Sequence, residues 1–215
     1  MANTIRLKRN TSAGVSPAVG SLATGELAIN TADGVLFTKN ESGTVLKLVP
    51  FNQYGLLVVG VGATARSVTC SSYANGTFAA TGDAQHRIGI LRISTTTATP
   101  AELSLDGAAA SNSNTFVLPN NATFHFEISV VARRTDTTGE HGAWHFSGCV
   151  SRDATAGTTA IVGTVGKTTV AKITDAWDCN VTADATNGRL VVTVTGQAAK
   201  TIRWVATAKI TEVTA

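Results

Sequence analysis

Apolar and polar residues alternate along most of the second half of the chain, and this period of two is typical of β-strands with one buried face. The longest example covers residues 123–133, where every second residue is large and apolar: Phe124, Phe126, Ile128 and Val130. Further candidate strands cover residues 86–93, 143–150, 168–173, 177–183, 189–195 and 200–213. Short strands separated by turns such as Asn187-Gly188 predict an all-β fold, with an antiparallel, jelly-roll-like β-sandwich over residues 86–215.

A separate small module is predicted over residues 1–49. Two short apolar-rich runs flank Asp33-Gly34, and Asp-Gly in this setting is among the strongest local signals for a β-hairpin. An isolated hairpin is only marginally stable in water, so we expect a partner chain or surface to complete it. The apolar residues expected to serve attachment or assembly are Ile5, Leu7, Leu27, Ile29, Leu36 and Phe37. Residues 50–85 are rich in Gly, Ala, Ser and Thr and are predicted to form a linker or an irregular extended segment, with Leu56–Val61 as a candidate buried piece.

The composition narrows the function classes. Only 14% of the 215 residues are charged, whereas about 25% is usual, and Thr, Ser, Asn and Gly take their place. A surface with so little charge fits a protein partly covered by copies of itself. The net charge of +3 is small, and the one basic cluster, Arg6, Lys8 and Arg9, lacks interleaved aromatic residues, so it is interpreted as a solvated segment rather than a nucleic-acid contact.

Two further features bear on the compartment. The longest apolar run, residues 56–63, is too short to span a bilayer, so no membrane insertion is expected. The three cysteines cannot all pair within one chain, which favours synthesis in a reducing compartment such as a bacterial cytoplasm.

One stretch of the first module has a recognisable sequence pattern. Gly25-Glu26-Leu27-Ala28-Ile29-Asn30-Thr31-Ala32-Asp33-Gly34, followed by Leu36-Phe37-Thr38-Lys39 and Ser42-Gly43-Thr44, resembles the N-terminal segment of many tailed-bacteriophage fibre proteins. More loosely, residues 124–126, 177–190, 194–196, 201–206 and 211–213 resemble the globular ends of phage fibre and head-decoration proteins. The resemblance implies a non-enzymatic homotrimer on the virion, bound to other virion proteins and made in the host cytoplasm.

The position on the particle stays open between two alternatives. The chain has no long repetitive shaft, which favours a short fibre or decoration protein on the head. The alternative is a tail fibre or spike adhesin that binds a host-surface glycan or protein, with Trp177 and Asn187 as surface contacts. A third reading is a monomeric carbohydrate-binding or hydrolytic β-sandwich, for which Asp175-Ala176-Trp177-Asp178 places carboxylates beside an aromatic ring. A turn with a core tryptophan explains that stretch more simply.

Other chemistry is weakly supported, and no catalytic residue, cofactor or metal is expected. Gly163-Thr164-Val165-Gly166-Lys167-Thr168 lacks the first glycine of a phosphate-binding loop, because Ile161 stands there, and a β-like run follows instead of a helix. His141, His145 and Cys149 would spread over roughly 26 Å of strand, too far for one ion. A site from His125, His145 and one cysteine on neighbouring strands, or from one histidine per chain on a trimer axis, stays open.

Overall fold

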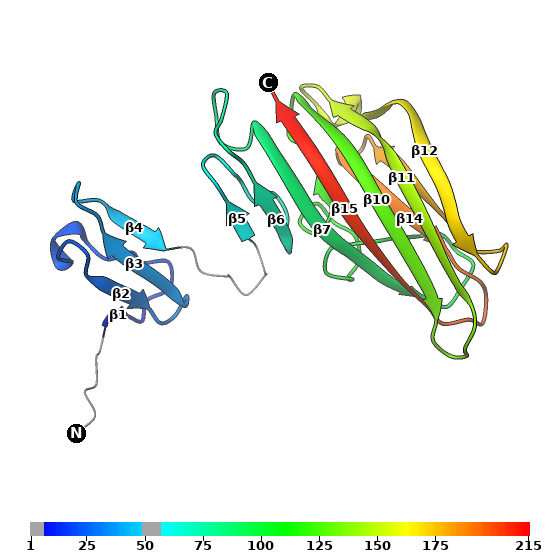
Figure 1. The fold of residues 1–215 in the computed structure, drawn as a ribbon, viewed down its shortest axis with the longest axis horizontal. Coiled ribbons are helices and arrows are strands. Elements are labelled where there is room, and N and C mark those ends of the chain that lie inside the picture. Colours follow the sequence, from blue (N-terminus) through cyan, green and yellow to red (C-terminus); the bar gives the residue numbers. More distant parts are fainter. Residues whose placement is uncertain (1–6, 49–56) are drawn as a thin grey trace. The chain divides into compact units, whose positions relative to one another are not determined.

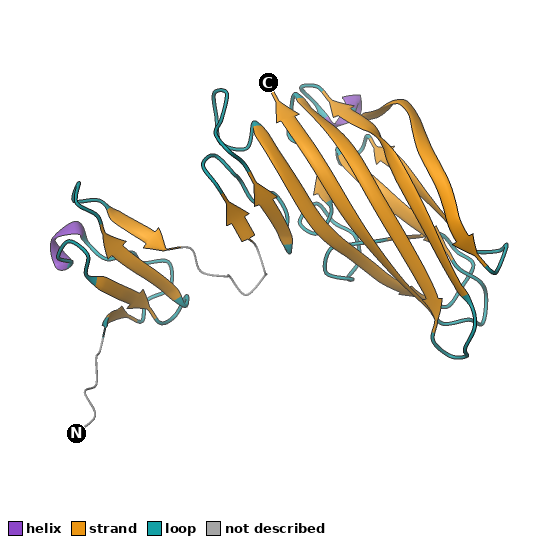
Figure 2. Cartoon of the chain, in the orientation of Figure 1, coloured by secondary structure: helices purple, strands orange, loops and turns teal. Residues whose placement is uncertain are grey.

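A computed structural model describes residues 7–48 and 57–215, and the chain divides into two compact units, Met1–Gln53 and Tyr54–Ala215. The described residues are built from β-strands, with two short 3₁₀ turns, η1 (Val19–Ser21) and η2 (Ala156–Thr158) (Figures 1 and 2). The prediction of an all-β fold is confirmed. Among the described residues, no helix has the length and apolar character needed to cross a bilayer.

The first unit holds a four-stranded sheet in the order β1-β2-β3-β4. Its strands are β1 (Lys8–Asn10), β2 (Leu27–Asn30), β3 (Val35–Lys39) and β4 (Val45–Leu48). β1 runs parallel to β2, and the other pairs are antiparallel. The predicted hairpin joins β2 to β3 at Asp33-Gly34, where Gly34 has a φ of 66°, a left-handed conformation that glycine adopts without steric cost.

The second unit is dominated by a seven-stranded sheet in the order β12-β11-β10-β15-β7-β6-β5 (Figure 1). Its strands are β5 (Leu57–Val59), β6 (Cys70–Tyr73), β7 (Ala84–Thr95), β10 (Ala122–Arg134), β11 (His141–Arg152), β12 (Ala160–Lys172) and β15 (Ile202–Thr214). All neighbours are antiparallel except β5 and β6, which are parallel.

A smaller sheet packs on one face of the large one and completes the sandwich. It consists of β13 (Asp178–Asp184), β14 (Arg189–Thr195) and β8 (Ala101–Glu102), with β9 (Phe116–Val117) also paired to β14. Inward-facing residues of both sheets form one hydrophobic core. Three tryptophans lie at its centre: the ring centroids of Trp144 and Trp204 are 5.7 Å apart, and those of Trp177 and Trp204 are 5.8 Å apart. The expected face of Phe124, Phe126, Ile128 and Val130 is fully buried.

The prediction of a linker over residues 50–85 is wrong from residue 57 onward. β5 and β6 belong to the large sheet, and β6 pairs with β7 from Cys70↔Gly89 to Tyr73↔His86. Cys70 and Ser72 are fully buried. The prediction took the many small side chains of this segment as a sign of a solvated linker. In the structure, small side chains such as that of Ser72 are packed closely inside the sandwich. Residues 50–56 lie outside the described residues.

Candidate attachment site

The four-stranded sheet of the first unit has one covered face. The loop of residues 11–22 folds over it and, with the sheet, buries Leu22, Ala28, Val35 and Phe37. These side chains share a face because Ala28 pairs with Phe37 across β2 and β3, and Asn30 pairs with Val35. This is a small core for a folded unit.

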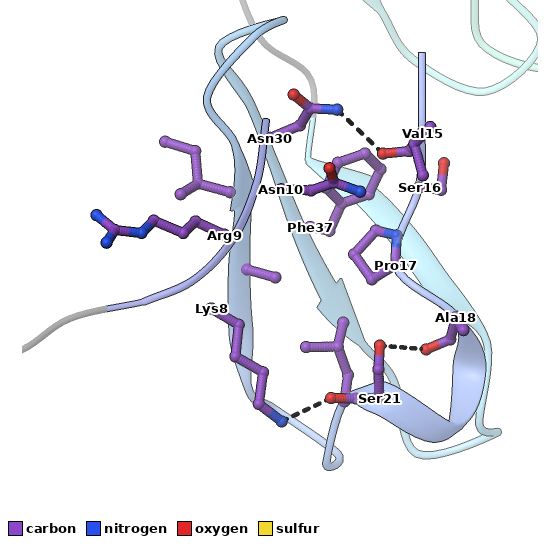
Figure 3. A pocket seen from close by; sticks show the side chains of 13 residues that line it. Lys8, Arg9, Asn10, Val15, Ser16, Pro17, Ala18, Ser21, Asn30 and Phe37 are labelled. Atoms are coloured by element: carbon purple, nitrogen blue, oxygen red, sulfur yellow. Dashed lines mark hydrogen bonds between the residues drawn. The ribbon is translucent and has the colours of Figure 1, made fainter. Parts of the chain in front are cut away.

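Polar contacts hold the loop against the sheet (Figure 3). The Asn30 amide, which is buried, donates to the carbonyls of Ser12 at 2.8 Å and Val15 at 3.1 Å. Lys8 Nζ donates to the Ser21 carbonyl at 2.6 Å and to Glu26 Oε2 at 2.8 Å. The hydrogen bond from Lys8 lowers the pKa of Glu26, and the Ala23 amide lowers it further.

A cavity of about 500 Å³ lies between this loop and the strands. Figure 3 shows Pro17 and Asn10 on the side of the sheet that also carries Phe37, while Arg9 projects the other way. The lining residues are Lys8, Arg9, Asn10, Val15, Ser16, Pro17, Ala18, Ser21, Leu22, Ala28, Ile29, Asn30 and Phe37. Seven of the thirteen lining residues are apolar, and Lys8 and Arg9 are the two charged ones.

The opposite face of the same sheet is open and apolar. Ile29 pairs with Leu36, and both are half-buried. Leu27 pairs with Thr38, which pairs in turn with Leu46, and the two leucines are 38% and 41% exposed. Among residues 7–48, this face therefore carries two exposed and two half-buried apolar side chains. We call Leu27, Ile29, Leu36 and Leu46 the open face.

Three of the six predicted attachment residues lie on the open face, namely Leu27, Ile29 and Leu36. Leu7, just before β1, is 38% exposed. Ile5 lies outside the described residues. The structure does not bring Phe37 to the others, because it lies on the covered face and is 4% exposed. The sequence analysis did not include Leu46 among the attachment residues. The alternation of Leu46 with Lys47 could have indicated that the two side chains lie on opposite faces of a strand.

Of the two predicted surface contacts in the second unit, one is contradicted. Trp177 is fully buried against Trp204, so it cannot serve as a surface contact or stack on a sugar. Its flanking carboxylates are engaged by lysines instead: Asp178 lies 2.7 Å from Lys167, and Asp175 lies 3.6 Å from Lys172. Asn187 is exposed at the turn before β14, and its role as a surface contact stays a prediction.

The other candidate chemistry falls on strands. The glycine-rich stretch of residues 163–169 lies within β12, so the chain continues there as a strand and does not open a helix whose N-terminus could bind phosphate. His141, His145 and Cys149 lie on β11, and His125 is the direct cross-strand partner of Cys149. In the part of the chain that the structure describes, no three His, Cys, Asp or Glu side chains converge in a way that could hold a metal ion.

Comparison with known proteins gives a partial similarity to phage fibres. No protein-family model matches the chain. A stretch of 44 residues, 20% of this chain, is 52% identical to the long tail fiber protein Gp37 of Escherichia phage AR1. Over the same length it is 50% identical to the proteins of that name from Enterobacteria phages T2 and K3. The chain spans only 3–4% of the length of these relatives. The similarity supports a structural protein of the fibre type, and the particular proteins that share the segment are components of bacteriophage tail fibres.

Proposed function

We propose that this chain is a non-enzymatic structural protein of a bacteriophage particle, a homotrimeric short fibre whose first unit mediates assembly and attachment. The observation that carries the proposal is the open face of the first unit. The partial similarity to phage tail-fibre proteins supports the same assignment.

The size of the first unit gives the physical reason. Below roughly 40 residues, a chain buries too little apolar surface to fold alone without a disulfide, metal or partner. The described part of this unit, residues 7–48, is close to that limit. Its buried core consists of only four apolar side chains, those of Leu22, Ala28, Val35 and Phe37. Covering Leu27, Ile29, Leu36 and Leu46 would add apolar burial worth about 25 cal/mol per Å² removed from water. Three copies of the unit around an axis would supply that cover reciprocally.

The oligomeric state of variants tests the assembly role. Leu27→Lys combined with Leu46→Lys places two charges on the open face, at positions already more than one third exposed, so the fold should tolerate them. We expect light scattering after size exclusion to give a trimer for the full wild-type chain and a lower trimer fraction for the double variant. Circular dichroism should show unchanged strand content.

A matched control is Val19→Lys, which adds a lysine at a 55% exposed apolar position of the same unit, on η1 and away from the open face. It should leave the trimer intact. A wild-type chain that stays monomeric at tens of micromolar would refute the proposal, and so would an equal loss of trimer in the control.

The place on the particle is a separate question. The head and the tail are the two alternatives, and the names of the relatives favour the tail. Immunogold electron microscopy of intact particles with antibody to residues 86–215 separates the two: gold over the head supports decoration, and gold at the tail supports an adhesin.

A further inference from the structure

Two arginines face each other on the outer surface of the large sheet. Arg133 on β10 and Arg203 on β15 are direct cross-strand partners. Their chain neighbours Ala132 and Trp204 are fully buried in the sandwich, so both arginines project to the opposite, solvent-facing side, and both are exposed. In such a pair the Cβ atoms lie roughly 4.5–5.5 Å apart, and like charges placed there destabilise the sheet.

A third guanidinium lies beside this pair. Arg92 on β7 is the partner of Val205, which makes it a diagonal neighbour of Arg203 at roughly 7–8 Å. Its guanidinium donates to the main-chain carbonyl of Asp106. It also lies against Gly107, where an added Cβ would come within 2.8 Å of Arg92 Nε. The hydrogen bond to Asp106 and the close approach at Gly107 therefore fix the Arg92 guanidinium on the side of β7 that faces residues 104–107.

Within the described part of the chain, none of these three arginines forms an ion pair. Acidic residues at the same end of the sandwich are already engaged. Asp136 lies 2.7 Å from Arg134, and Glu140 lies 2.7 Å from Lys200. The Asp106 carboxylate accepts hydrogen bonds from other groups of its own loop and from a neighbouring amide.

A cavity of about 290 Å³ is lined by Arg92 and Arg203, whereas Arg133 does not line it and lies beside it as the cross-strand partner of Arg203. Ser94, Gly107 and Val205 also line it, which gives one hydroxyl and one half-exposed apolar wall. At about 30 Å³ per water molecule, the space equals roughly ten waters, which is more than a bare ion fills. The cavity therefore has room for an organic group next to the cations.

We propose that Arg92, Arg133 and Arg203 form an oxyanion site, which we call the arginine site, for a small organic molecule that carries a phosphate or a carboxylate. The planar guanidinium matches both oxyanions with two parallel N–H···O bonds. A bound anion also removes the repulsion that Arg133 and Arg203 exert on each other. The site uses residues of a single chain, so it does not depend on the proposed trimer.

Calorimetry and thermal unfolding of the full chain test the site at low salt with four probes: inorganic phosphate, glucose 6-phosphate, glucuronate and neutral glucose. At least one of the two acidic sugars should bind and raise the unfolding temperature, because a ligand of the native state stabilises it. Glucose should do neither. Preference for glucose 6-phosphate over glucuronate identifies the oxyanion as phosphate, and the reverse preference identifies it as carboxylate.

Arg203→Gln should weaken binding of the acidic sugar by about tenfold or more, since it removes charge-assisted hydrogen bonds. In the absence of ligand, this variant should be as stable as the wild type or more so, because it removes a like-charge pair. A purely structural role for Arg203 predicts the opposite change in stability.

The matched control is Lys209→Gln, which removes one positive charge from the same strand and the same face, at the position opposite Glu127. It should leave binding unchanged. Equal weakening in both variants would overturn the proposal, because diffuse charge would then explain the binding. Failure of both acidic sugars to bind the wild-type chain would also overturn it.

Discussion

Arg87 Nε lies 2.9 Å from Glu212 Oε2, and both side chains are fully buried inside the sandwich. The guanidinium also lies 4.8 Å from the centroid of the Phe124 ring. Glu212 also forms a second ion pair, because Arg66 Nε lies 2.6 Å from its Oε1. The ion pair between Arg87 and Glu212 joins β7 to β15. The ion pair between Arg66 and Glu212 attaches the loop before β6 to the same carboxylate. A one-residue shift between these strands would expose or separate the two charges, so the pair specifies the register.

Glu212→Gln should lower the free energy of unfolding by about 3–5 kcal/mol, because it leaves the Arg87 charge buried without its partner. Urea unfolding followed by tryptophan fluorescence measures this, since all three tryptophans lie in the second unit. Glu127→Gln, on the exposed side of β10, is the matched control and should change stability by less than about 0.5 kcal/mol. Similar effects of the two variants would contradict the role given to the buried pair.

Gly89→Ala should destabilise the second unit by about 1–3 kcal/mol through overpacking. An added Cβ would come within 2.6 Å of Leu105 Cδ2, 2.7 Å of Phe116 Cζ and 2.9 Å of Cys70 Sγ. The same substitution at Gly157 meets only one atom, at 3.9 Å, and serves as the control in parallel urea titrations. If alanine is tolerated equally at both positions, the packing around β7 is looser than described.

Acid should weaken the second unit partly through Asp184. Hydrogen bonds from Asn187 and then from Arg189 lower the pKa of this carboxyl to about 2. The pKa of an aspartate in an unfolded chain is about 3.9. The contribution of Asp184 to the free energy of unfolding is therefore complete above that pH, and it is lost as the pH falls from about 4 towards 2. Asp184→Asn should therefore flatten the loss of stability over this range, measured as the urea midpoint at several pH values. Asp175→Asn, at a fully exposed side chain, should leave the slope unchanged.

The three thiols should differ in reactivity. Burial raises the pKa of Cys70 to about 11 and that of Cys179 to about 12, so neither forms much thiolate at neutral pH. Cys149 is only half-buried. Titration of the native chain with a thiol reagent at pH 8 should modify Cys149 quickly and the other two slowly, whereas all three react after unfolding in urea. Fast modification of Cys70 in the native chain would contradict its buried position.

The faces of some strands were readable from the sequence and those of others were not. On β10 the large apolar residues all occupy one side, so Phe124 and Ile128 could be assigned to the core from alternation alone. β7 has apolar residues on both sides. Leu91 and the charged Arg87 lie inside, while Ile90 is 57% exposed. A buried cation is acceptable there only because Glu212, far along the chain, supplies its partner.

One of the two candidate sites could likewise be predicted from the sequence, and the other could not. The hairpin and most of the open face follow from local signals, since the Asp33-Gly34 turn fixes the register that places Ile29 beside Leu36. The arginine site was invisible in the sequence, because Arg133 and Arg203 lie 70 positions apart and meet only through the pairing of β10 with β15.

Local signals in the sequence were enough to predict the hairpin and most of the long strands of the sandwich, because strand alternation and turn chemistry act over a few residues. Only the tertiary structure shows that β5 and β6 complete the large sheet and which charged side chains face one another. Those outcomes depend on the pairing of distant strands and on which face the second sheet covers, and neither is encoded within a single strand.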